Sequence, residues 1–85
     1  MQPSLNTTVR RTETGIYEFS PHVVEINVLD RLGKPVWTSG RQNGGSQIRW
    51  SGVDLYGHAL AVGNYMFKVI CPDNQAYYLP FIHAD

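Results

Sequence analysis

Hydrophobic and polar residues alternate along much of this chain with a period of two. In the segment 22–29, Val24, Ile26 and Val28 fall on one face and Glu25 falls on the other, a pattern typical of a half-buried β-strand. No window repeats apolar residues at the spacing of an amphipathic helix, so we expect no helix longer than one turn. Turn residues separate the alternating segments at the spacing that is typical of all-β domains.

The segment 64–71 alternates as regularly as 22–29. Its residues Tyr65, Phe67, Val69 and Cys71 share one face, which we expect to point into the core. The same pattern, in shorter or less regular form, predicts strands over residues 5–9, 15–20, 35–39, 47–50 and 76–83.

Strands with one apolar and one polar face can bury their apolar faces when two antiparallel sheets pack together. The 5 Tyr, 3 Phe and 2 Trp side chains supply enough aromatic surface to dominate such a core. We therefore predict an all-β fold, an immunoglobulin-like β-sandwich of two antiparallel sheets and about seven strands. The sandwich is expected to span residues 14–85, after an N-terminal extension or weak first strand over residues 1–13. Because proline cannot donate to a ladder, the last strand is expected at a sheet edge or bulged at Pro80.

The stretch from Trp50 to Tyr65, WSGVDLYGHALAVGNY, joins two predicted strands and is rich in turn residues. Gly52 and Gly57 permit backbone angles that other residues resist. The carboxylate of Asp54 stands where it can accept N–H groups of the turn that follows it. We interpret the stretch as a structural connection, in which the polar and glycine residues bend the chain and the apolar ones anchor it.

Together with the segment 24–36, this stretch resembles the immunoglobulin-like module of flagellar hook-capping proteins and of other multidomain extracellular bacterial proteins. The shared pattern is a strand, an Asp-x-x-Gly turn, a return strand, Trp-x-Gly-x-Asp-x-x-Gly, a Leu, and a Gly-x-Tyr that opens the next strand. The matching positions are Asp30, Gly33, Trp50, Gly52, Asp54, Gly57, Leu60, Gly63 and Tyr65. The resemblance covers residues 16–71 and implies a non-catalytic structural module.

The residues offer little to an enzyme or to a bound cofactor. The glycine-bounded loops lack the Lys-Ser/Thr ending of a phosphate loop, and no helix is predicted after them. Asp54 is the one acid in its stretch, whereas Ca²⁺ takes several carboxylates. His22, His58 and His83 do not have the spacing of zinc ligands. A nucleophilic pair of Cys71 with a histidine stays open, although we expect Cys71 to be a buried small hydrophobe. We therefore predict no enzyme, no cofactor and no metal site.

Charge and hydropathy limit the class of partner. The 7 basic and 7 acidic residues cancel, which disfavours nucleic acid. No apolar run reaches the ~20 residues of a membrane span, so we expect no membrane insertion. The one cysteine excludes an internal disulfide. We expect an extracellular, cell-surface or periplasmic module whose export signal lies outside these residues.

The resulting hypothesis is a non-enzymatic module of a larger exported bacterial protein, which acts as a spacer, an assembly contact or a docking surface for neighbouring proteins. We expect contacts through Trp37, Arg41, Tyr56 and His58, because these residues lie in loops or on a predicted open face. Trp37 is expected to point outward if Val36 points inward. Two alternatives stay open: a carbohydrate-binding module that holds a glycan on exposed aromatic rings, and a hook-cap-like assembly domain.

Overall fold

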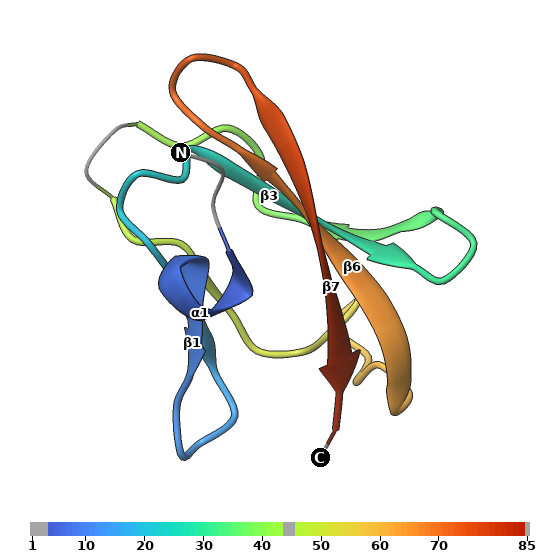
Figure 1. Cartoon of the computed structure of the whole chain (residues 1–85). Coiled ribbons are helices and arrows are strands. Elements are labelled where there is room, and N and C mark those ends of the chain that lie inside the picture. The colour runs from blue at the N-terminus through green and yellow to red at the C-terminus, as the bar shows by residue number, and fades with distance from the viewer. Residues whose placement is uncertain (1–3, 44–45, 85) are drawn as a thin grey trace.

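Two antiparallel sheets face each other in the computed structural model, which describes residues 4–43 and 46–84 (Figure 1). The elements are α1 (Leu5–Thr8), β1 (Val9–Arg11), β2 (Tyr17–Phe19), β3 (Glu25–Asp30), β4 (Pro35–Thr38), β5 (Arg49–Trp50), β6 (Gly63–Ile70) and β7 (Ala76–His83). One sheet has the strand order β1-β2-β5 and the other has the order β4-β3-β6-β7. The prediction of an all-β sandwich of two antiparallel sheets is confirmed.

The segment 5–9 was expected to be a strand, and this prediction is wrong for its first four residues. They form α1, a single helical turn in which the Thr8 N–H donates to the Ser4 carbonyl at 3.1 Å. The Ser4 N–H also donates to Thr7 Oγ1 at 3.4 Å, and the two hydroxyl groups lie 3.0 Å apart. Serine and threonine hydroxyls compete for nearby backbone groups in this way, and the local bonds favour a turn over an extended chain. The strand begins only at Val9, where β1 pairs with β2.

The two longest strands of the larger sheet are β6 and β7, which pair side by side along their whole length (Figure 1). Their register is continuous from the pair Gly63–His83 to the pair Ile70–Ala76. Since β7 has β6 as its one neighbour in the sheet, Pro80 lies on an edge strand, without a bulge. This position fits a residue with no backbone N–H to give to a second neighbour.

Aromatic side chains from both sheets fill the space between them. Trp50 is 2% exposed, and its ring centroid lies 5.0 Å from that of Tyr17 within the smaller sheet. Across the core, the Trp50 ring meets Phe67 edge-on at 5.8 Å and Phe81 edge-on at 6.1 Å. The rings of Phe67 and Phe81 stack on each other at 3.8 Å. Edge-to-face pairs of this kind add to the free energy gained by burying the rings.

The chain that follows β5 packs closely against the end of β7. Gly52 has a φ of +80°, and a Cβ at this position would lie 2.8 Å from Cε1 of His83. His83 is itself buried and shares a hydrogen bond of 2.9 Å between its Nδ1 and the Tyr17 hydroxyl. Gly52 is therefore required both for its backbone angle and for its lack of a side chain.

We expect Gly52→Ala to destabilise the fold by about 3 kcal/mol, the sum of the strain at positive φ and the clash with His83. Gly57→Ala is the matched control, because Gly57 has a φ of +84° but nothing within 4 Å of an added Cβ. Gly57→Ala should lower the free energy of unfolding by only about 1 kcal/mol. Urea denaturation of the two variants measures both values, and equal losses would contradict the contact with His83.

Candidate functional site

The connection from Trp50 to Tyr65 contains a tight turn organised by Asp54. Oδ1 of Asp54 accepts the N–H groups of Tyr56 and His58, each at 2.9 Å. The Asp54 N–H donates to the His58 carbonyl at 2.8 Å, and the Gly57 N–H donates to the Asp54 carbonyl at 3.1 Å. The N–H of His58 is the main reason that the pKa of Asp54 lies below its ordinary value. The carboxylate is thus engaged with its own turn.

Asp30 organises the turn between β3 and β4 in the same way. Its Oδ1 accepts the N–H groups of Leu32 and Lys34, each at 2.9 Å. The Asp30 N–H donates to the Lys34 carbonyl at 2.9 Å, and the Gly33 N–H donates to the Asp30 carbonyl at 2.9 Å. Gly33 has a φ of +82°, close to the +84° of Gly57. The two Asp-x-x-Gly sequences therefore fold into the same turn.

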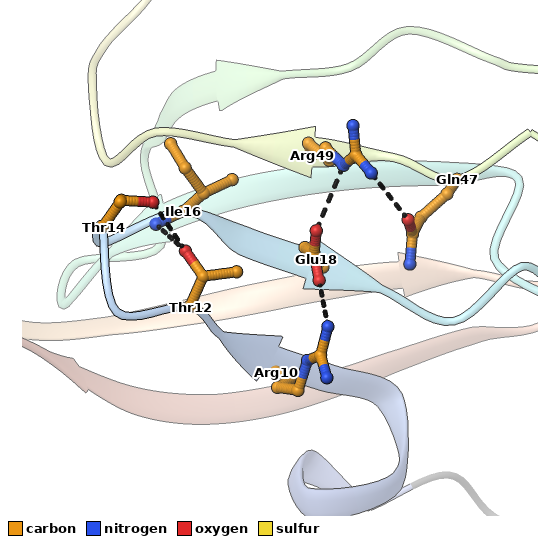
Figure 2. Close-up of polar contacts among 7 residues, drawn as sticks. All are labelled: Arg10, Thr12, Thr14, Ile16, Glu18, Gln47 and Arg49. Carbon is orange, nitrogen blue, oxygen red and sulfur yellow. Dashed lines mark hydrogen bonds and ion pairs between the residues drawn. The ribbon is translucent and has the colours of Figure 1, made fainter.

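The β1–β2 and β6–β7 connections repeat this backbone geometry with other residues. In the first, the Ile16 N–H donates to Thr12 Oγ1 at 3.1 Å, and Gly15 has a φ of +85° (Figure 2). In the second, the residue at positive φ is Asn74, whose N–H donates to the Cys71 carbonyl at 2.8 Å. A tight turn followed by one left-handed residue is a common way to close a three-residue hairpin.

The ends of the long connection are held by side chains. The indole N–H of Trp50 donates to the Val53 carbonyl at 2.8 Å. The hydroxyl of Tyr65 donates to the Ala61 carbonyl at 2.7 Å, and Leu60 is partly buried against the core. Each of these bonds keeps the connection in place, and none of them prepares a group for chemistry.

Trp37 was expected to point outward, and this prediction is wrong. Trp37 is half-buried, and its ring lies 5.8 Å from that of Trp50. The pairing places Trp37 opposite the fully buried Val28, so both side chains face the core. A register shift between Val28 and Leu29 allows Val36 to be partly buried as well, although it is the next residue to Trp37.

The other three expected contact residues are exposed; Tyr56 and His58 lie together, and Arg41 lies apart from them. Tyr56 is 85% exposed, and its ring stands 6.4 Å from that of His58 on the same turn. Arg41 donates to the Asn74 side chain at 3.1 Å, which places it beside the β6–β7 turn. Since the Asp54 turn precedes the start of β6 and Asn74 follows its end, Arg41 lies at the opposite end of that strand.

Exposed apolar side chains lie on the β3–β4 turn and on the long connection. Four of them, which we call the apolar end, are Leu32, Leu55, Tyr56 and Val62, with exposures of 84%, 60%, 85% and 60%. The Leu55 N–H donates to the carbonyl of Val36 in β4 at 3.1 Å, which joins the Asp54 turn to the β3–β4 hairpin. Leu32 and Val62 line one groove of about 340 Å³. Sequence reasoning found Tyr56 and missed the others, although a leucine inside an Asp-x-x-Gly turn is a usable signal of an exposed apolar tip.

A second feature that the sequence did not reveal lies on the outer face of the smaller sheet. Glu18 of β2 lies between Arg10 of β1, at 2.6 Å, and Arg49 of β5, at 3.2 Å (Figure 2). The hydrogen bond from Arg10 is the first cause that lowers the pKa of Glu18 below its ordinary value. The row crosses all three strands and ties them together from outside.

Cys71 lies at the far end of the sandwich, in a cavity of about 480 Å³ that His22, Asp73 and Tyr77 also line. Burial, and then the charge of Asp73, raise the pKa of the Cys71 thiol. A protonated thiol is a weak nucleophile and a weak metal ligand. Residues 4–43 and 46–84 contain no group of three metal-binding side chains close enough to hold an ion.

The chain matches no model of a known protein family, and no curated protein or solved structure is significantly similar to it. The resemblance to the hook-capping module therefore stays a prediction. In the part of the chain that the structure describes, no helix has the length and apolar character needed to span a membrane.

The row around Glu18 should make stability depend on pH. A carboxylate whose pKa is lower in the folded than in the unfolded state stabilises the fold above its unfolded pKa. That contribution is lost as the pH falls through the lowered folded value. We expect Glu18→Gln to be less stable than the parent at neutral pH, with the difference disappearing below the ordinary pKa of 4.5. Thermal melts of Glu18→Gln and the parent over this pH range test the prediction. Glu13→Gln is the control, because it makes the same change in charge. A stability difference between Glu18→Gln and the parent that persists in strong acid would contradict the ion pairs.

Cys71 should react slowly with iodoacetamide at neutral pH, because little of it is thiolate. Asp73→Asn should increase the rate by removing the nearby negative charge that raises the thiol pKa. The pH dependence of alkylation gives the pKa of the Cys71 thiol in the parent and in Asp73→Asn. A parent midpoint below that of free cysteine would show an activated thiol and contradict this assignment.

Proposed function

We propose that this chain is a non-catalytic, immunoglobulin-like module of a larger exported bacterial protein, and that it docks a neighbouring protein through its apolar end. The observation that carries the proposal is the set of four exposed apolar side chains, Leu32, Leu55, Tyr56 and Val62, of which Leu32 and Val62 line one groove. The backbone bond from Leu55 to Val36 joins the Asp54 turn to the β3–β4 hairpin that carries Leu32. Grouped exposed apolar residues mark surfaces that a partner covers.

The turns that carry Leu32, Leu55 and Tyr56 are held in one conformation before any partner arrives. In each turn a carboxylate oxygen accepts two backbone N–H groups, and a glycine takes the left-handed angle that closes the loop. A surface that is already ordered loses little conformational entropy on binding. This rigidity supports a role in presentation, whether the module acts as a spacer, an assembly contact or a docking surface.

The geometry favours docking over a carbohydrate-binding role. Flat glycan sites need several aromatic rings exposed on one surface, and the half-burial of Trp37 against Trp50 withdraws one of the expected rings. Tyr56 stays exposed on its turn, whereas Tyr78, which is 52% exposed, lies on β7 opposite Lys68. A hook-cap-like assembly domain is a special case of the docking role.

Hydroxyl-radical footprinting can test the proposal directly. The probe is this chain alone, compared with the same residues inside the protein that natively carries them. We expect Leu32 and Tyr56 to be labelled in the isolated chain and to be protected severalfold in the natural protein, while the exposed Tyr78 is labelled equally in both. Equal labelling of all three residues in both forms would remove the docking role of this end.

A further inference from the structure

We propose that the groove between Leu32 and Val62 accepts an apolar side chain from an acidic segment of the partner protein. This inference rests on the docking function proposed above and specifies the chemistry of the partner. The groove is lined by residues from the β3–β4 turn and from the start of β6, namely Asp30, Arg31, Leu32, Val62, Gly63, Asn64 and Tyr65.

The groove is small, and apolar side chains form part of its lining. Its volume of about 340 Å³ is at the lower end of the range for small-molecule pockets. Leu32 and Val62 form exposed apolar walls, with exposures of 84% and 60%. Burial of a leucine or phenylalanine side chain between these walls would remove apolar surface on both partners from water.

The charge at the rim selects an acidic partner. Arg31 lines the groove, and Lys34, which closes the same turn, is also exposed. The neighbouring acid is Asp30, whose Oδ1 already accepts the N–H groups of Leu32 and Lys34. The turn therefore carries two cations and one carboxylate, and its net charge is positive. A carboxylate on the partner would complement this excess of positive charge.

The same charges argue against a second copy of this chain as the occupant. A second copy of this chain in a two-fold contact would bring Arg31 and Lys34 close to the same residues of its partner, which is unfavourable. An anionic bilayer would match the charge as well, and its acyl chains are apolar, so vesicle binding is one outcome of the test below. A protein segment satisfies both the shape and the charge.

The test uses three synthetic peptides and amide chemical shifts of the labelled 85-residue chain. The probe has one leucine flanked by aspartates in a serine–glycine background. One control peptide replaces the aspartates with lysines, and the other replaces the leucine with serine. We expect the probe to shift the amides of Leu32, Val62 and Asn64 with a Kd of about 1 mM. Each control peptide should bind about tenfold more weakly.

Variants of the chain separate the apolar contact from the charge. Leu32→Ser should weaken binding of the probe about tenfold, and the double variant Arg31→Gln with Lys34→Gln should reduce the preference for aspartate over lysine. Tyr78→Ser and Arg41→Gln are the matched controls at exposed positions away from the groove, and they should leave binding unchanged. Thermal melts confirm that each variant is folded.

Three results would overturn the inference. The first is no binding of the probe, or equal shifts with all three peptides. The second is binding to vesicles of phosphatidylcholine and phosphatidylglycerol that Leu32→Ser abolishes, which would assign the groove to a membrane. The third is self-association, detected by sedimentation, that Leu32→Ser abolishes. If footprinting protects the apolar end while the peptides fail, the docking function stands and the acidic-segment chemistry falls.

Discussion

Trp50 is the residue through which the two sheets and the long connection depend on one another. It belongs to the smaller sheet, yet its ring lies against Phe67 and Phe81 of the larger one. Its indole N–H is bonded to the Val53 carbonyl, so the same side chain that fills the core also fixes the start of the connection. A buried indole N–H without an acceptor would be unfavourable, and the connection supplies that acceptor. The packing of the core and the position of the long connection therefore both depend on Trp50.

One turn geometry, used at four places, determines what the ends of the sandwich present to solvent. Each turn places one residue at positive φ, and each closes on itself through backbone bonds. At two of these turns, aspartate oxygens accept the backbone N–H groups. The side chains at the tips of these two turns therefore do not hold the turn together. Leu32 and Leu55 are exposed for this reason, and an apolar side chain at such a tip is free to serve a partner. The proposed function follows from this division of roles within the turn.

Most of the strands and both Asp-x-x-Gly turns could be predicted from the sequence because their signals are local, namely period-two alternation and the pairing of aspartate with glycine. Features that depend on the register between distant strands could not. Trp37 faces the core because a shift in pairing sets it opposite Val28, and its own neighbours in sequence indicate the reverse. The row of Arg10, Glu18 and Arg49 exists only once three separate strands have paired. Of the apolar end, only Tyr56 was predicted to be a contact residue. The groove that Leu32 and Val62 share forms only once β3 and β6 have paired.

The exchange rate of the Trp50 indole proton tests the central claim most directly. If the bond to the Val53 carbonyl ties the connection to the core, this proton exchanges only when the whole domain unfolds. Its opening free energy, measured by hydrogen exchange, then equals the free energy of unfolding from urea denaturation. Exchange through a much smaller opening free energy would show that the connection detaches while the core stays folded, and would contradict the account.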